Sequence, residues 1–404
     1  MITAADIDAA MARIRASIYL SPCAYSETYS RQTGLKIHFK LENLQMTGSF
    51  KERGALNRLL TLGDDERARG VIAASAGNHA QGVAYNATRL GIRSTIVMPE
   101  TTPLIKVTST REHGAQVVLH GANYDAACEE ALRRAAADGA TFVHPFDDDA
   151  VIAGQGTIGL ELLEQEPNLD VVVAPIGGGG LIGGLACALK ERRPSIKVIG
   201  VQAERLPSAR AALTGGRPVA VDAALTLADG IAVRRTGERT LPLIQKYVDD
   251  VVTVSEDEIA NGILLLLERE KTVAEGAGAA PLAAVINGRA AIPLGKRTVL
   301  LVSGGNIDVN LLSRIIERGL AKDGRLMKLE VRLLDTPGAL HKLIGVFAEH
   351  GANILDVSHI RAFSGVDLNE TVVDVTVETR GPQHVQEILR GLRLSGHEHR
   401  RRVL

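Results

Sequence analysis

The sequence has 404 residues, of which 45% are hydrophobic and 23% charged, and its formal net charge is −1. These values are typical of a globular protein of two or three domains, and they exclude a basic nucleic-acid-binding surface, because the one basic run is His399–Arg402. Three cysteines without close spacing and an N-terminus without a long apolar segment predict a cytoplasmic protein with no disulfide framework and no secretory signal.

The first predicted elements lie in the N-terminal 46 residues, which we expect to form a capping segment. Apolar residues recur with helical spacing over 4–18, and Ser21-Pro22 interrupts this pattern. Residues 36–41 (KIHFKL) alternate between apolar and polar, which is typical of a half-buried strand, and Glu42-Asn43 ends it.

Lys51 lies in the segment that follows. Thr47-Gly48 is typical of a turn, Ser49 is a good helix N-cap, and Glu52 stands where it completes a capping box. Lys51 is then in the first turn of a helix, where the helix dipole and burial both lower the pKa of an amine. A lysine that loses its proton near neutral pH is a nucleophile for carbonyl carbon atoms.

A strand, a loop and a helix are predicted next, over 71–74, 75–82 and 83–90. This arrangement offers backbone N–H groups to an anion, either a phosphate or a substrate carboxylate. In the loop, we expect His79 to be structural, whereas the amide of Asn78 is placed to donate to a phenolate-like oxygen. Strands and helices continue to alternate, as in an open parallel sheet. The further strands are predicted at 94–98, 116–119 and 141–144, and the further helices at 106–112 and 124–137.

A second strand, loop and helix are predicted over 170–176, 177–180 and 181–191. The loop is Gly177-Gly178-Gly179-Gly180, whose backbone can approach a phosphate closely at the start of the helix. The six glycines and the proline of 171–189 argue against a membrane span. The glycines also match the dinucleotide fingerprint, and Glu204 is the acid expected roughly 20 residues on, so a Rossmann oxidoreductase is an alternative.

Two later loops carry isolated polar residues. Glu275 stands among small residues in 272–278, where it is either a solvated carboxylate or faces a ligand. A strand over 298–302 leads into Ser303-Gly304-Gly305-Asn306. The hydroxyl of Ser303 is therefore expected at the carboxyl end of a sheet strand, where ligands of open α/β sheets bind. Asn306 is interpreted as a cap for the helix that follows.

The pattern changes after a boundary near 321–325. Residues 327–333 alternate as a half-buried strand, Asp335–Gly338 forms a turn, and 340–347 gives a helix face. Strands over 353–362 and 371–378, a helix over 383–394 and a possible last strand complete the order βαββαβ, the ferredoxin-like motif. We therefore expect a separate α+β domain over 326–404.

Four segments together resemble the pyridoxal-phosphate-dependent threonine dehydratases, which belong to the tryptophan-synthase-β-like enzymes. The segments are Ser49-Phe50-Lys51 with Arg53-Gly54-Ala55, Ser75 to Gly82, Gly177 to Leu181, and Ser303 to Asn306. The resemblance covers residues 1–320. It implies an α/β fold of two open, twisted, mostly parallel sheets with helices on both faces (PLP fold type II), with a smaller subdomain over 47–145.

The C-terminal part resembles an ACT domain, a regulatory module that binds small ligands. Asp335–Gly338 and Gly351–Ile354 match its ligand-site loops. The resemblance implies that 326–404 binds an amino-acid effector, such as a branched-chain end product, at an interface between subunits. It also implies a homodimer or homotetramer, and a place in amino-acid metabolism such as isoleucine biosynthesis.

The resemblance to the dehydratases also implies a role for each motif residue. Lys51 would hold pyridoxal 5'-phosphate as a Schiff base and then remove the α-proton of the substrate. Asn78 would hydrogen-bond the ring hydroxyl, and Ser303 would face the ring nitrogen, where a neutral hydroxyl favours elimination over transamination. The remaining residues assigned to the cofactor are Phe50, Gly177, Gly178, Gly179, Gly180, Leu181 and Glu275, and those assigned to the substrate carboxylate are Ser75, Ala76, Gly77, Asn78 and His79.

Two departures from related enzymes refine the expected activity. The related serine racemases carry a second acid/base serine where this chain has Ala76, which favours dehydration over racemisation. Relatives with a divalent cation pair a glutamate with an aspartate six residues later, but here Arg210 stands six residues after Glu204. We therefore assign no metal ligand and expect either a monovalent ion or none. The sequence thus predicts an L-threonine ammonia-lyase with L-serine as a slower substrate. Alternatives are a dehydratase for serine or 3-hydroxyaspartate, a β-replacement synthase, and a non-catalytic amino-acid sensor.

Overall fold

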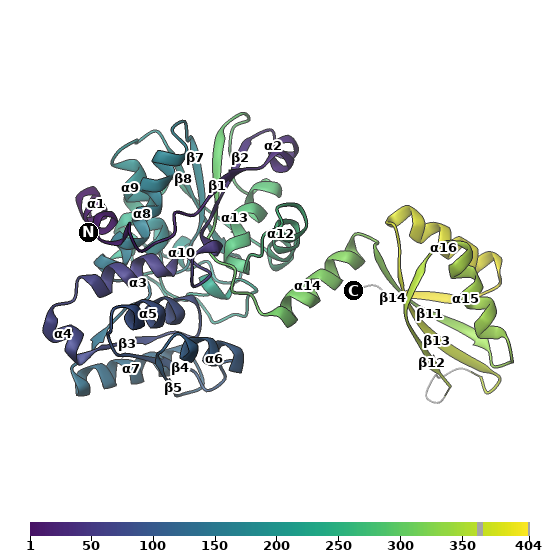
Figure 1. Cartoon of the computed structure of the whole chain (residues 1–404). Coiled ribbons are helices and arrows are strands. Elements are labelled where there is room, and N and C mark those ends of the chain that lie inside the picture. The colour runs from purple at the N-terminus through teal and green to yellow at the C-terminus, as the bar shows by residue number, and fades with distance from the viewer. Residues whose placement is uncertain (362–366, 403–404) are drawn as a thin grey trace. The chain divides into compact units, whose positions relative to one another are not determined.

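The computed structural model describes residues 1–361 and 367–402 (Figure 1). By its internal contacts the chain divides into two compact units, Met1–Ile307 and Asp308–Leu404. No helix in the described ranges is both long and apolar enough to cross a bilayer. The apolar stretch 171–189 is divided between a strand, a glycine loop and a helix, as the sequence predicts.

The first unit contains two sheets, as expected from the sequence. The larger has six strands, all parallel apart from the antiparallel pair at one edge. In spatial order they are β1 (Cys23–Tyr25), β2 (Lys36–Leu41), β10 (Arg297–Val302), β7 (Val171–Pro175), β8 (Lys197–Ala203) and β9 (Asp250–Val254). The smaller sheet has four parallel strands. Their order is β5 (Gln116–Leu119), β4 (Ser94–Met98), β3 (Val71–Ala74) and β6 (Thr141–Phe142).

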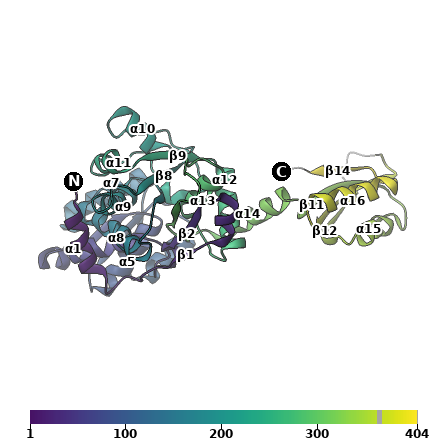
Figure 2. The same ribbon diagram turned by 90° about the horizontal axis from the view of Figure 1, so that it is seen from above.

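Helices cover both faces of each sheet (Figures 1 and 2). The helices of the first unit are α1 (Ala4–Ile14), α2 (Glu27–Thr33), α3 (Lys51–Leu60), α4 (Asp64–Arg69), α5 (Asn78–Arg89), α6 (Leu104–Glu112), α7 (Tyr124–Asp138), α8 (Asp149–Gln165), α9 (Gly180–Lys190), α10 (Ser208–Gly215), α11 (Thr240–Tyr247), α12 (Glu256–Arg269) and α13 (Gly276–Ile286). Two 3₁₀ turns, η1 (Glu42–Leu44) and η2 (Asp229–Ile231), complete it.

The strands of the smaller sheet show why both faces are covered. Ile96 and Met98 pack on the side of α5, whereas Val97, between them, packs on the side of α7. Because successive side chains of a strand point to opposite faces, a strand that is apolar throughout must be buried on both. The larger sheet follows the same rule, with α8 and α9 on one face and α13 on the other.

Three predictions about these elements are wrong. The helix predicted over 83–90 begins at Asn78, so most of the expected loop is its first turn. The capping box of Ser49 and Glu52 does not form: α3 has no side-chain cap, and Glu52 accepts instead from the N–H of Thr47 at 3.0 Å. The reason is that residues 48–50 pair with the loop after β10 rather than closing the helix. Asn306 caps no helix, because Asp308 caps the next one.

The second unit has the predicted order βαββαβ after a leading helix. Its elements are α14 (Val309–Lys322), β11 (Leu326–Leu334), α15 (Ala339–Glu349), β12 (Asn353–Ile360), β13 (Glu370–Glu378), α16 (Pro382–Leu394) and β14 (His399–Arg402). The antiparallel sheet has the order β12-β13-β11-β14, and α15 and α16 pack with it in one core. The end of the strand predicted over 353–362 lies outside the described residues at Ala362.

Candidate functional site

Lys51 is the first residue of α3, and its amine lies against the chain after β6. Nζ donates a hydrogen bond to the carbonyl of Pro145 at 2.8 Å. Burial lowers the pKa of Lys51 to about 8, an effect that the nearby carboxyl of Glu275 partly offsets. The burial of Lys51 agrees with the lowered pKa that the sequence predicts, and an amine with this pKa is a nucleophile at mildly alkaline pH.

The segment before Lys51 joins the loop that follows β10. The N–H of Phe50 donates to the carbonyl of Ser303 at 3.0 Å, and Ser49 forms an isolated β-bridge with Gly304. The hydroxyl of Ser303 is buried and has no partner within the described residues. Two segments some 250 residues apart thus bring the lysine and an unpaired hydroxyl into one site.

The glycine loop Gly177–Gly180 connects β7 to α9. The carbonyl of Gly178 accepts from the hydroxyl of Thr240 at 2.6 Å and from the N–H of Gly237 at 3.2 Å. In contrast, none of the four loop N–H groups has an acceptor in the described part of the chain. With its carbonyl turned into the protein and its N–H groups unpaired at a helix start, the loop is suited to a phosphate.

Packing against Phe146 explains why this loop is made of glycine. A Cβ atom on Gly178 would lie 2.3 Å from the ring of Phe146, and Gly179 has the positive φ of +99° that favours glycine. The sequence predicts that the missing side chains admit a ligand, but at Gly178 and Gly180 the space is filled by Phe146. Because Phe146 follows Pro145, the same contact places the loop beside Lys51.

The loop from Ser75 to His79 presents a second set of free N–H groups. The N–H of Ser75 donates to Val97 in the sheet, and that of Gly77 donates to the hydroxyl of Ser75 at 3.2 Å. Those of Ala76, Asn78 and His79 have no acceptor among the residues described. This start of α5 therefore keeps three donors for an anion such as a carboxylate.

His79 has a structural role, as the sequence predicts. Its Nε2 lies 2.8 Å from the carbonyl of Val143, which can only accept, so Nε2 carries the hydrogen. Burial, with the charge of Lys51, lowers the pKa of His79 to about 3. The imidazole therefore stays neutral at physiological pH and fixes α5 to the end of β6.

Asn78 and Glu275 meet beside Gly304, in the loop that follows β10. Asn78 lies in the first turn of α5, and its Nδ2 donates to Oε1 of Glu275 at 2.7 Å. Glu275 precedes α13 and is buried, and burial together with the charge of Asp229 raises its pKa to about 8. The solvated loop carboxylate is thus excluded, and Glu275 faces the site.

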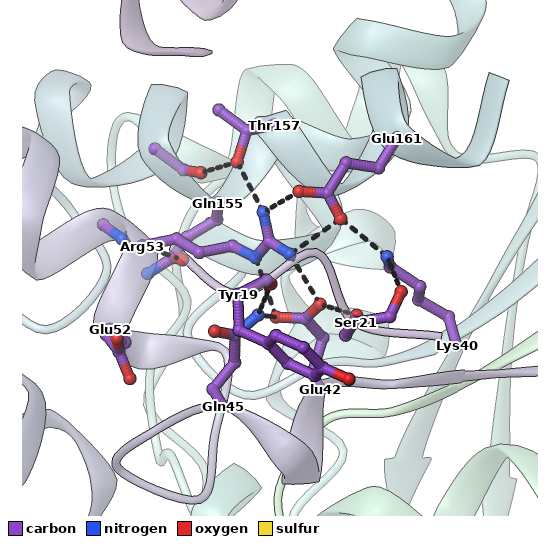
Figure 3. A network of polar contacts seen from close by, with 12 residues as sticks. Tyr19, Ser21, Lys40, Glu42, Gln45, Glu52, Arg53, Gln155, Thr157 and Glu161 are labelled. Atoms are coloured by element: carbon purple, nitrogen blue, oxygen red, sulfur yellow. Dashed lines mark hydrogen bonds and ion pairs between the residues drawn. The ribbon is translucent and has the colours of Figure 1, made fainter. Parts of the chain in front are cut away.

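A buried ionic cluster around Arg53, two residues after Lys51, was not predicted from the sequence. It consists of Arg53, Glu42, Glu161 and Lys40, and Figure 3 shows the guanidinium group of Arg53 between the two carboxylates. Arg53 donates to Glu42 at 2.7 and 2.8 Å and to Glu161 at 2.6 and 2.8 Å. Although burial opposes ionisation, Arg53 keeps the pKa of Glu42 below its usual range.

The cluster joins four elements. Lys40 of β2 binds Glu161 of α8 at 2.6 Å, while Glu42 belongs to η1 and Arg53 to α3. Its two cations and two carboxylates balance in charge, which is the condition for keeping ions in a protein interior. Because Arg53 lies two residues after Lys51, the cluster fixes the start of the helix that carries the lysine.

Comparison with known proteins identifies relatives over nearly the whole chain. A family model described as pyridoxal-phosphate dependent enzyme matches residues 14–304, and an ACT domain model matches 328–394. The chain is 51% identical over 398 residues to the L-threonine ammonia-lyase of Thermotoga maritima, spanning 98% of this chain and 99% of the relative.

Solved structures give the same result for the first unit. A threonine deaminase from T.th. has 42% identity and a TM-score of 0.72, covering 76% of this chain and 99% of that one. The serine racemase of maize has 32% identity and a TM-score of 0.74, covering 79% and 98%. The fold predicted from the sequence is therefore confirmed, and these comparisons favour it over the Rossmann oxidoreductase.

Proposed function

The chain belongs to the pyridoxal-phosphate-dependent enzymes and carries an ACT domain, and we propose that it is an L-threonine ammonia-lyase. The reaction converts L-threonine into 2-oxobutanoate and ammonia, with one water lost and one regained. L-Serine would react more slowly to give pyruvate. One observation carries the proposal: the amine of Lys51, with its pKa lowered to about 8, donates to Pro145, and the next residue, Phe146, packs against the glycine loop, whose N–H groups have no acceptor among the described residues.

The residues present fit the cofactor. Pyridoxal phosphate supplies an aldehyde for amines and a ring that accepts electrons from the substrate. The N–H groups of Gly177–Gly180 and Leu181 would hold its phosphate, and the buried hydroxyl of Ser303 would face the ring nitrogen. Asn78 would donate to the ring hydroxyl, while Phe50 and Glu275 would border the ring.

The substrate is proposed to bind at the start of α5. The free N–H groups of Ala76, Asn78 and His79 would hold its carboxylate, whereas those of Ser75 and Gly77 are already used within the protein. The backbone N–H groups of Ser75 and Gly77 therefore shape this loop rather than donate to the carboxylate. Lys51 Nζ would take the proton from the α-carbon, a step that needs the unprotonated amine.

Residue 76 favours elimination over racemisation. Inverting the α-carbon needs an acid on the face opposite to Lys51, and Ala76 has no group that carries a proton. The maize serine racemase, at 32% identity, shares the fold, so the fold alone does not decide between the two reactions. The proposal therefore places proton transfer at the α-carbon on Lys51 alone.

The purified enzyme tests this proposal by its products. Incubation with L-threonine, without any added nucleophile, should release 2-oxobutanoate and ammonia in equal amounts. A β-replacement enzyme would release neither until a nucleophile is added, and a racemase would give an isomer of the substrate. Either of those results would overturn the proposal, as would a clear preference for L-serine or 3-hydroxyaspartate over L-threonine.

The second unit is proposed to bind an amino-acid effector, which supports a regulated role such as isoleucine biosynthesis. The ACT model over 328–394 supports the effector site, and association into a homodimer or homotetramer is part of the same proposal. The domain boundaries 1–320 and 326–404, which assign α14 to the catalytic part, are part of this proposal too.

We also propose a cytoplasmic location, which agrees with the three cysteines, none of which forms a disulfide.

A further inference from the structure

Asn306 links three segments of the site by its side-chain amide. Nδ2 donates to the carbonyl of Thr47 at 2.8 Å and to Oδ1 of Asn78 at 2.8 Å. Asn78 in turn donates from its own Nδ2 to Glu275 at 2.7 Å. The result is a chain of hydrogen bonds from the turn before Lys51 to the start of α13.

The direction of this chain is set at the Thr47 end. A backbone carbonyl can only accept, so the Asn306 amide must turn its nitrogen toward Thr47. The second hydrogen of that nitrogen then points to Asn78, whose oxygen must face Asn306. Consequently, the nitrogen of Asn78 faces away from Asn306. One of its hydrogens is used by Glu275, and the other has no acceptor among the residues that the structure describes, so it is left for a ligand.

Glu275 by itself would not orient Asn78. Burial raises the pKa of Glu275 to about 8, so the carboxyl group is largely protonated at neutral pH. A protonated carboxyl group can donate to an amide oxygen as readily as it accepts from an amide nitrogen. Both orientations of Asn78 would therefore satisfy Glu275, whereas only one satisfies Asn306.

Two glycines make room for these contacts. A Cβ atom on Gly48 would lie 2.5 Å from Oδ1 of Asn306, and Gly48 also has a positive φ of +71°. A Cβ atom on Gly304 would lie 2.5 Å from Oε1 of Glu275 and 3.2 Å from Nδ2 of Asn78. Any other residue at either position would displace a member of the chain of hydrogen bonds.

We propose that Asn306 is a positioning residue that turns an N–H group of Asn78, rather than its carbonyl oxygen, toward the ring hydroxyl of the cofactor. The inference rests on the proposed role of Asn78 in binding pyridoxal phosphate. An N–H donor stabilises the deprotonated ring oxygen, and a carbonyl oxygen in its place would repel it. Asn306 itself touches no reacting atom.

The substitution Asn306→Asp tests this orientation while nearly preserving the shape of the side chain. A carboxylate has no hydrogen to donate to Thr47 or Asn78, so Asn78 is free to turn over. The bound cofactor absorbs in the visible when its ring oxygen is deprotonated, and in the near ultraviolet when that oxygen carries its proton. We expect the visible-to-ultraviolet ratio of the holoenzyme to fall roughly tenfold, and the Kd of the apoenzyme for pyridoxal phosphate to rise by a similar factor.

Asn43→Asp is the matched control. Asn43 also binds through Nδ2, to the hydroxyl of Thr272 at 2.8 Å and the carbonyl of Val273 at 2.9 Å, in the segment that leads to Glu275. The amide of Asn43 is not part of the chain of hydrogen bonds that orients Asn78. Asn43→Asp should therefore disturb the contacts of this segment without changing the visible-to-ultraviolet ratio. If Asn306→Asp does not fold, Asn306→Ser, which is smaller and uncharged, takes its place with the same expected direction.

A double variant shows whether Asn306 acts through Asn78. In the Asn78→Ala background, Asn306→Asp should have no further effect on the spectrum or on the Kd. An unchanged ratio in Asn306→Asp, an equal shift in Asn43→Asp, or additive effects in the double variant would each overturn the inference. A wild-type protein without a visible band would instead refute the proposed function.

Discussion

Lys51 shows, at the scale of single residues, how burial determines chemistry. Only the unprotonated amine attacks an aldehyde, so the pKa of about 8 controls how fast the apoenzyme captures its cofactor. The capture rate should rise about tenfold per pH unit up to about pH 8 and then level off. The appearance of visible absorbance after mixing apoenzyme with pyridoxal phosphate at each pH measures this rate.

An ordinary amine provides the control for the cofactor's own ionisation. Nα-acetyl-lysine, whose amine has a pKa of about 10.4, should still react faster with each step in pH above 8. If the apoenzyme followed the same rising curve to pH 10, the amine of Lys51 would have an ordinary pKa, and the account of its burial would be wrong.

The residues of the site can be named from the sequence because each lies in a recognisable local motif. Lys51 follows a turn, and a predicted strand leads into each of the loops that contain Asn78, Ser303 and the four glycines. Their hydrogen-bond partners cannot be named in the same way. From the sequence alone Asn306 is interpreted as a helix cap, because its partners, Thr47 and Asn78, are more than 200 residues away.

At the scale of elements, the position of α3 depends on the buried ionic cluster. Replacing Arg53 by methionine leaves Glu42 and Glu161 buried without their shared partner, and removing one member of a buried ion pair costs about 3–5 kcal/mol. We expect Arg53→Met to lower the free energy of unfolding in urea by this amount. The visible cofactor band should weaken as well, because α3 carries Lys51.

Arg15→Met is the matched control for this prediction. Arg15 also pairs with a glutamate of α8, Glu164, but its side chain is 66% exposed. An exposed ion pair contributes little, so the free energy of unfolding should change by less than about 1 kcal/mol. Equal losses in the two variants would show that the burial of the cluster adds nothing.

The elements that escape sequence analysis are those governed by contacts between distant segments. Helix α8 contains glycines at 154, 156 and 159, which weaken a helix pattern, yet they allow close packing: a Cβ on Gly154 would lie 2.7 Å from Gly54 of α3. The sequence predicts a polar, half-buried face for strand β2. Instead Lys40 is fully buried, because the cluster satisfies its charge.

At the scale of the whole molecule, the second unit is expected to bind an effector. The order βαββαβ could be predicted because two of its strands, 327–333 and 371–378, alternate between apolar and polar residues, and the ACT model confirms the domain. Titration calorimetry of the full chain with L-isoleucine and L-valine should give saturable binding heat for at least one of them. No heat with either amino acid would contradict the proposed effector class.

Gly338→Ala locates the binding site within the predicted loops. Gly338 precedes α15 with a φ of +89°, in the first of the two loops that match ACT ligand sites. Straining this loop should weaken effector binding roughly tenfold. Gly396→Ala is the matched control, since Gly396 has a similar φ of +77° and equally open space around it but lies outside both loops. Equal weakening in both variants would place the site elsewhere.

The central claim is that Lys51 holds pyridoxal phosphate and handles the substrate proton, and the visible spectrum of Lys51→Ala tests it most directly. The wild-type holoenzyme should show a visible band that changes on addition of L-threonine, and so should the control Lys190→Ala, whose lysine pairs with Asp249 at the far end of α9. Lys51→Ala should lack both the lysine-bound band and the release of 2-oxobutanoate. A Lys51→Ala enzyme that kept the band and turned over threonine at the wild-type rate would contradict the account.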